Sequence, residues 1–249
     1  MITVQHLQKA YNDQLVLRNV SFQVQTGEFI AIMGPSGSGK TTLLNTLSTL
    51  DTFNAGRVII DGADITLMKQ ADRRLLRRDK LAFIFQNYNL LDTFTVKENI
   101  YLPFTLAGRV TAELDKRFVE LADRLNISPL ADKFPAQLSG GEKQRVAATR
   151  AFLSNPKVLF ADEPTGALDT RSATAMLETL AELNRTMQTT LLMVTHDGRA
   201  ASFANRVIFM VDGVIVNEFY RGDKSQSAFF DEIAEVSHRL GSIESAGIQ

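Results

Sequence analysis

One stretch of this sequence combines the residue types that bind phosphate. Directly after the apolar run 29–33 it reads Gly34, Pro35, Ser36, Gly37, Ser38, Gly39, Lys40 and Thr41. The glycines allow successive backbone N–H groups to turn toward a phosphate, and a helix that begins near Gly39 adds the positive end of its dipole. Lys40 would reach the β- and γ-phosphates, and the Thr41 hydroxyl would bind Mg²⁺. The pattern predicts binding of a nucleoside triphosphate.

Two adjacent acids, Asp162 and Glu163, follow a second apolar run at 158–161. Many strands end in an acidic residue by chance. In a chain with a phosphate-binding loop, however, Asp162 is expected to hold Mg²⁺ through its water shell. Glu163 would stand where a carboxylate can accept a hydrogen bond from an attacking water. Both acids are therefore candidates for chemistry at the phosphate.

A further glycine-rich motif begins at Ser139. Ser139 and Glu142, three residues apart, predict a capping box for a helix over 143–153. Gly140 and Gly141 would also leave bare N–H groups at the start of that helix, which is a second possible anion site. The residues alone leave both roles open.

Three other side chains lie at predicted strand ends, and two of them, Tyr11 and His196, have a plain structural explanation. Tyr11 could stack on an adenine ring, although a lone tyrosine there is more often a half-buried packing residue. Gln86 follows the buried-strand pattern 81–85, at the edge where α/β sheets bind ligands. His196 follows the apolar run 189–195 and by itself would more often be structural or exposed than catalytic.

The elements that must position these residues begin with strands. Short segments predict an antiparallel sheet edge near the N-terminus, at 3–7, 15–17 and 20–24. Buried-strand patterns recur at 29–33, 81–85, 158–162 and 189–195. Asp-Gly pairs predict hairpins at 61–62 and 212–213.

Helical patterns lie between these strands. From 95 to 156 the chain reads as a helical insertion, with one apolar stripe formed by Leu114, Phe118, Leu121 and Leu125. Another helix is expected over 170–183. The tail predicts a short helix near 229–240 and fraying beyond it. The basic run 73–80 could be a nucleic-acid patch, but its interleaved leucines favour the solvated face of a short helix.

Composition narrows the class of protein. The chain has 249 residues, of which 45% are hydrophobic, enough for a sizeable core. Lys and Arg number 27 against 28 Asp and Glu, so the charge gives no reason to expect a nucleic-acid partner. The N-terminus lacks signal-peptide character and no apolar run is long enough to cross a membrane, which predicts a cytoplasmic chain. The absence of cysteine excludes disulfides, Fe–S clusters and cysteine-based zinc sites.

Taken together, these motifs resemble the ATP-binding subunit of ABC transporters, in the family's order and over nearly the whole chain. The resemblance implies an α/β P-loop NTPase fold with a mostly parallel sheet, an N-terminal antiparallel β-subdomain and a helical subdomain insertion. A single domain would span 1–249. Its core and β-subdomain would comprise 1–86 and 157–220, its helical subdomain about 87–156 and its C-terminal tail 221–249.

The resemblance also implies a role for each motif. ATP would be bound by the loop 34–41 together with Tyr11, Val16, Thr42, Gln86 and His196. Mg²⁺ would be bound by Thr41, Gln86 and, through water, Asp162. Catalysis would involve Lys40, Glu163 and the switch residue His196. No motif position is substituted, so the site is expected to hydrolyse ATP. The signature motif would be Leu138, Ser139, Gly140, Gly141 and Glu142, and the D-loop would be Ala167, Leu168 and Asp169.

The partners implied by the family are a second copy and a membrane permease. Two subunits are expected to pack head to tail on ATP, so that Ser139 of one chain closes over the phosphate held by Lys40 of the other. The permease contact is expected within 87–104, which would place the chain on the inner face of the cell membrane.

Within the family, the chain looks like the branch that acts with FtsX-like permeases. The segment 90–93, Ala167 and the tail segment 229–232 most resemble bacitracin-type peptide-resistance subunits. The function expected is an ATPase that drives a permease for antimicrobial-peptide resistance. The alternative is an ATP-driven subunit that signals through an FtsX-like partner, in cell division or lipoprotein release, without transport. A third possibility is a soluble ATPase of the DNA-repair or Fe–S-assembly type. Long coiled-coil arms and cysteines for zinc modules are missing, which argues against most repair ATPases.

Overall fold

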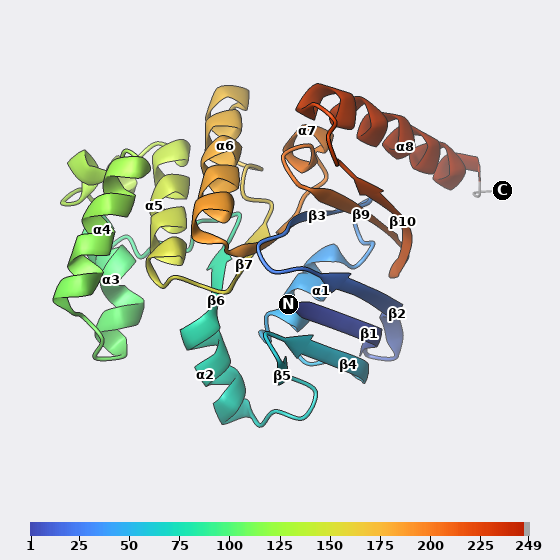
Figure 1. Ribbon diagram of the computed structural model, residues 1–249, viewed down its shortest axis with the longest axis horizontal. Helices are drawn as coiled ribbons and strands as arrows, with labels where there is room; N and C mark the ends of the chain where they lie inside the picture. Colours follow the sequence, from blue (N-terminus) through green and yellow to red (C-terminus); the bar gives the residue numbers. More distant parts are fainter. Residues whose placement is uncertain (247–249) are drawn as a thin grey trace.

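A six-stranded sheet forms the centre of the computed structural model, which describes residues 1–246 (Figure 1). Its order is β10-β9-β3-β8-β7-β6, and all neighbours are parallel except the hairpin of β9 and β10. The strands are β3 (Phe29–Met33), β6 (Leu81–Ile84), β7 (Val158–Asp162), β8 (Thr190–Val194), β9 (Arg206–Val211) and β10 (Val214–Tyr220). β3 and β8 are buried throughout, as expected for parallel strands with both faces covered. The predicted mostly parallel α/β sheet is confirmed.

A four-stranded antiparallel sheet lies beside it, in the order β2-β1-β4-β5. Its strands are β1 (Ile2–Tyr11), β2 (Gln14–Val24), β4 (Ala55–Ile60) and β5 (Ala63–Asp64). The antiparallel N-terminal segment was correctly predicted, but β2 is one strand where two were expected. The register shifts between the pairs Leu7–Val20 and Gln8–Arg18, and Asn19 has a φ of 77°. A bulge at Asn19 therefore carries the strand across the polar interruption.

Helices α3 (Val96–Leu106), α4 (Ala112–Arg124) and α5 (Gly140–Leu153) form the predicted helical insertion, at the left of Figure 1. Two short 3₁₀ turns, Ser128–Leu130 and Pro135–Gln137, connect α4 to α5. The α4 stripe is confirmed, since its four apolar side chains are buried. The basic run forms helix α2 (Gln70–Lys80), in which Leu76 is buried among exposed and half-buried charged residues.

Alternation along β3 divides the core between the two faces of the central sheet. Ile30 and Ile32 pack with α1 (Lys40–Leu47) and the antiparallel sheet. Phe29, Ala31 and Met33 belong to the second cluster, which includes residues of α5, α6 (Thr170–Met187) and α7 (Gly198–Ala201). The carboxyl ends of β3, β7 and β8 are thus held from both sides, and the chemistry-bearing motifs follow these ends.

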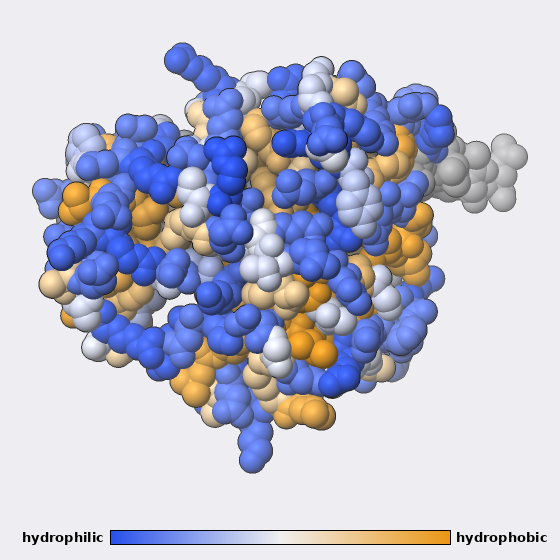
Figure 2. Space-filling model, in the orientation of Figure 1, coloured by the Kyte–Doolittle hydropathy of each residue, from blue (hydrophilic) through white to orange (hydrophobic). Residues whose placement is uncertain are grey.

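The C-terminal tail differs from the expectation of a short helix that frays after 240. Helix α8 runs over Gln226–Ala246. Phe229 and Ile233 are fully buried in the core that also contains residues of α7, so packing anchors the first turns of the helix. The predicted fraying at 247–249 lies outside the described residues. The face in Figure 2 is largely hydrophilic, and no helix of residues 1–246 has the length and apolar character needed to cross a membrane.

Candidate active site

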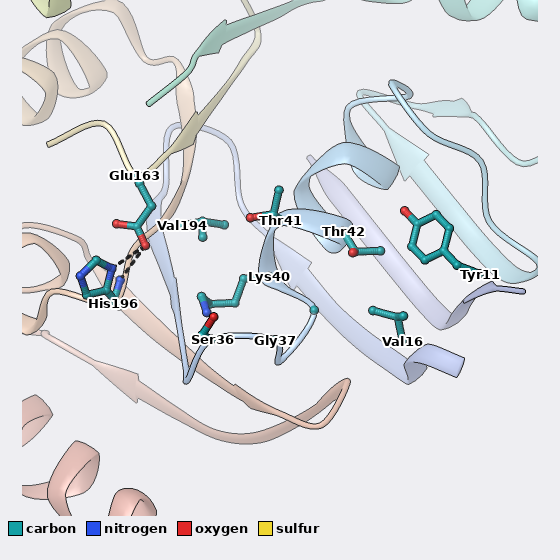
Figure 3. Close-up of a pocket in the computed structure, with 11 residues that line it drawn as sticks. Tyr11, Val16, Ser36, Gly37, Lys40, Thr41, Thr42, Glu163, Val194 and His196 are labelled. Atoms are coloured by element: carbon teal, nitrogen blue, oxygen red, sulfur yellow. Dashed lines mark hydrogen bonds and ion pairs between the residues drawn. The ribbon is translucent and has the colours of Figure 1, made fainter. Parts of the chain in front are cut away.

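A cavity of about 740 Å³ opens at the carboxyl ends of the central strands (Figure 3). Tyr11 and Val16 lie at one end of it, and Glu163 and His196 lie at the other. The residues that line it are Tyr11, Val16, Ser36, Gly37, Gly39, Lys40, Thr41, Thr42, Glu163, Val194 and His196. The structure therefore brings together predicted residues from five separate parts of the sequence.

The loop 34–41 takes the conformation that its glycines predict. Gly34 has a φ of 147°, and a Cβ there would lie 1.9 Å from the carbonyl oxygen of Met210, so only glycine fits. Gly39 has a φ of 94° and caps the start of α1. The first residues of that helix, Lys40, Thr41 and Thr42, face the cavity. Their backbone N–H groups have no partner within the helix and are available to an anion.

The Lys40 ammonium lies inside the curl of this loop. Its Nζ donates hydrogen bonds to the carbonyl oxygens of Gly34 at 2.9 Å and Pro35 at 2.6 Å. Burial lowers the pKa of Lys40, and the nearby charges of Asp162 and Glu163 oppose that shift. The loop thus holds a positive group at the position where phosphate charge is expected.

Thr41 and Asp162 come together from different elements. The Thr41 hydroxyl donates to Asp162 Oδ1 at 3.3 Å, which joins the start of α1 to the end of β7. The pKa of Asp162 is raised, mainly by burial and also by the charge of Glu163, although the Thr41 hydrogen bond and the Lys40 charge oppose the shift. A hydroxyl and a carboxylate are hard oxygen donors of the kind Mg²⁺ prefers. Residues 1–246 contain no cluster of three His, Asp or Glu side chains that would hold a metal alone, so phosphate and water would complete the coordination.

Glu163 is held from two sides. Its Oε1 lies 2.8 Å from Nδ1 of His196 and accepts the His196 backbone N–H at 3.1 Å, while Oε2 accepts the Thr195 hydroxyl at 3.3 Å. Its backbone N–H donates to the carbonyl of Val194 at 2.9 Å. The φ of Glu163 is 46°, a left-handed backbone conformation that residues other than glycine rarely adopt. Such strain persists where surrounding bonds fix the residue, as they do here.

Gln86 does not line the cavity. Its amide nitrogen lies 3.0 Å from the point that a Cβ at Gly166 would occupy, so it packs against the segment that follows Glu163. The absence of a side chain at Gly166 makes room for this amide. Among the residues of the predicted loop, Gly34, Pro35 and Ser38 also lie outside the cavity lining.

The signature and D-loop residues likewise lie away from the cavity. Ser139 caps α5 by the predicted box: its hydroxyl accepts the Glu142 N–H at 3.3 Å, and Glu142 Oε2 accepts the Ser139 N–H at 2.7 Å. A Cβ at Gly140 would lie 3.5 Å from the carbonyl of Ala167 and 3.6 Å from Leu168. The two motifs therefore adjoin each other in one chain without reaching its cavity.

Sequence reasoning missed two residues of the site. Val194 lines the cavity, and Thr195 binds Glu163. Both precede His196 in the apolar run, and their position at the end of a strand next to β7 is the signal that could have identified them.

Comparison with known proteins places these motifs in a family. The ABC transporter family matches residues 17–166. The chain belongs to the ABC transporter family. It is 46% identical to the bacitracin export ATP-binding protein BceA of Halalkalibacterium halodurans, over 94% of this chain and 92% of that protein. This similarity confirms the predicted resemblance to bacitracin-type subunits.

Solved ABC cassettes share the fold. Two structures of MJ0796, one described as a dimeric bacterial ABC transporter cassette and one as a post-hydrolysis dimer bound to ADP and phosphate, each match with a TM-score of 0.80 and 36% identity. Each match covers 88% of this chain and 98% of that one. This ABC protein is an ATP-binding subunit of a transporter, binds ATP with Mg²⁺ and is an ATPase.

Proposed function

We propose that this ATPase drives a membrane permease that protects the cell against antimicrobial peptides of the bacitracin kind. The observation that carries the proposal is the similarity to BceA, which is 46% identical over 94% of this chain and is named for bacitracin export. Because a substrate would be recognised by the permease, the ATPase subunit would supply the energy step and not the specificity.

ATP would lie along the cavity of Figure 3. The base would stack on Tyr11 beside Val16, and the triphosphate would lie in the loop 34–41 and against Thr42. Two features support this orientation: the aromatic ring and the loop lie at successive positions along the cavity, and the free N–H groups start at Lys40. The Lys40 ammonium would exchange its carbonyl partners for phosphate oxygens.

The far end of the cavity would carry the hydrolysis. Glu163 would accept a hydrogen bond from the attacking water, with its carboxylate oriented by Thr195 and His196. Thr41 and Asp162 would hold Mg²⁺, which when bound neutralises charge on the phosphoryl oxygens. His196 would respond to the phosphate through its exposed ring. Gln86 would have to leave Gly166 to reach the γ-phosphate or the metal.

A second copy would complete the site. The signature residues and the D-loop lie outside the cavity of their own chain, so a head-to-tail partner would present Ser139, Gly140 and Gly141 to the phosphate. The dimeric cassettes of MJ0796 support this arrangement. The first N–H groups of α5 follow the capping residue Ser139, which is exposed. They could therefore contact a phosphate that is bound by the other chain.

The permease would bind where the helical subdomain, residues 87–156, meets the β core. A groove of about 420 Å³ lies there between α2, β6, α3 and α5. Apolar side chains such as Leu102 and Phe104 line it together with several arginines, which suits an amphipathic segment of an FtsX-like permease. Closure of the ATPase dimer would then move this groove and the permease with it. Bound in this way, the chain would lie on the inner face of the cell membrane.

Drug susceptibility tests the proposed transport role. A strain that lacks this chain should become more sensitive to bacitracin and regain resistance with the wild-type chain but not with Glu163→Gln. Sensitivity to an unrelated macrolide should stay the same in all strains. Unchanged bacitracin sensitivity together with a division or lipoprotein defect would favour the signalling alternative.

Co-purification tests the partner. A tagged chain extracted from membranes in detergent should retain an FtsX-like integral-membrane protein, and Leu102→Arg in the groove should release it. Val216→Arg, at an exposed position on β10, is the matched control and should retain the protein. Retention by both variants would argue against the groove.

A further inference from the structure

Lys9, Tyr11 and Asp51 form a cluster at one end of the cavity. Lys9 Nζ donates to Asp51 Oδ1 at 2.9 Å, and the Tyr11 hydroxyl donates to Asp51 Oδ2. The same ammonium lies 4.5 Å from the centroid of the Tyr11 ring. Tyr11 is 44% exposed and lines the cavity, whereas Lys9 is 6% exposed and is not among its lining residues. An ion pair between a buried lysine and a half-buried aspartate therefore supports an accessible aromatic ring.

The fold builds this cluster from two elements. Lys9 and Tyr11 are two residues apart on β1, and their side chains lie on the same side of it because both bond Asp51. Asp51 lies in the loop that follows α1. This loop is fastened to β1 because the Asn54 N–H donates to the carbonyl of Gln8 at 2.9 Å and the Asn54 side chain accepts the Ala10 N–H at 2.8 Å. Helix α1 thus has the phosphate-binding loop at its start and the support of Tyr11 beyond its end.

The Asp51 carboxylate stays ionised within the cluster. Burial alone would raise the pKa of Asp51, but the hydrogen bonds from Lys9 and Tyr11 outweigh it, and the pKa is lowered. An ionised Asp51 keeps a cation next to the Tyr11 ring. A cation over one face of an aromatic ring is attracted by the ring's quadrupole, which holds the ring in place and leaves its other face for stacking on a base.

A purely structural role does not account for the whole arrangement. Asn54 already ties the loop to the β1 backbone through one backbone and one side-chain hydrogen bond. Fastening the loop to β1 does not require the Tyr11 hydroxyl to donate to Asp51. It also does not require the Tyr11 ring to lie next to the Lys9 ammonium. Both contacts act on the ring of Tyr11, because the hydrogen bond holds its hydroxyl and the ammonium lies over its centroid.

We propose that Lys9 and Asp51 are positioning residues for the nucleotide base: they fix the orientation of the Tyr11 ring and place a positive charge on one face, so that the other face stacks on adenine. The inference rests on the proposed nucleotide site. It predicts that both residues act on the base of ATP and not on its phosphates.

Titration of the full-length chain with Mg·ATP and with magnesium tripolyphosphate, which has no base, separates these effects. Lys9→Met should weaken ATP binding about two- to fivefold, the range of a cation–π contact to an exposed ring. Tripolyphosphate binding should not change. Lys9→Arg should restore ATP affinity because it keeps the cation. Asp51→Asn is the second variant and should show the same selective loss.

Two controls make the result decisive. Lys97→Met removes an ammonium that lies 5.6 Å from the ring of Tyr101, away from the cavity, and should leave both ligands unaffected. In a Tyr11→Leu background, where stacking is lost, Lys9→Met should have no further effect on ATP.

The two proposals fail in different ways. Equal loss of ATP and tripolyphosphate binding in folded Lys9→Met, or no loss of either, would overturn the positioning role and leave the nucleotide site intact. A wild-type chain that binds tripolyphosphate no better than Lys40→Ala would overturn the proposed phosphate site and, with it, this inference.

Discussion

The imidazole Nδ1 of His196 lies 2.8 Å from Oε1 of Glu163, and the same oxygen accepts the backbone N–H of His196 at 3.1 Å. The side chain of Glu163 is only 16% exposed, whereas that of His196 is 74% exposed. The hydrogen bond therefore links a half-buried carboxylate to a solvent-exposed imidazole. A substitution of Glu163 should therefore reduce the rate of hydrolysis more than it reduces ATP affinity.

Glu163→Gln should reduce turnover by about 10²- to 10⁴-fold, the usual contribution of a general base, with little change in ATP affinity. The amide oxygen can still accept the His196 N–H, so the shape of the site is kept. Steady-state ATPase rates and ATP titration measure the two effects. Light scattering after size exclusion should also show an ATP-dependent dimer of the variant. Wild-type turnover in the variant would contradict the role of Glu163.

Lys40→Ala should weaken ATP binding about 10- to 100-fold, because a hydrogen-bonded charge at the phosphates is lost. The measurement is a calorimetric titration with Mg·ATP. Lys116→Ala, at an exposed position on α4, is the control and should bind as the wild type does. Undiminished affinity of Lys40→Ala would contradict the phosphate site.

The outline of this site could be predicted because its main signals are local in sequence. The loop 34–41, the Ser139–Glu142 capping box and the α4 stripe each depend on residues a few positions apart, and each takes its expected form. The contact of Lys9 with Asp51 spans 42 positions and was not predictable, since only the packing of β1 against the loop after α1 creates it. Gln86 shows the same limit: its place at a strand end was clear, but its orientation toward Gly166 depends on tertiary packing.

Asp79 links stability to pH. It accepts hydrogen bonds from Arg78 at 2.9 Å and Arg109 at 2.6 Å, and these lower its pKa to about 2. A carboxyl whose pKa is lowered by folding stabilises the protein above its unfolded pKa, and this stabilisation is lost as pH falls toward the folded value. The contribution should be present at pH 6 and shrink between about pH 4 and pH 2.

Asp79→Asn should therefore lower the free energy of unfolding at pH 6 by up to about 1 kcal/mol, as expected for a partly exposed ion pair. Urea unfolding of variant and wild type at pH 6, 4 and 3 should show the difference narrowing as pH falls. Asp132→Asn, at an exposed position, is the control. A difference that stays constant or widens toward low pH would contradict the prediction.

Phe229 should anchor α8 to the rest of the domain. Its side chain is fully buried in the cluster that contains residues of α5, α6 and α7, although it comes from the tail. Phe229→Ala would remove this packing and leave a cavity, which should cost about 3–5 kcal/mol in the free energy of unfolding. Phe134→Ala, where the ring is 44% exposed, should cost well under about 1 kcal/mol. Urea denaturation compares the two variants. If Phe229→Ala proved no more destabilising than Phe134→Ala, α8 would not be an integral part of the folded core.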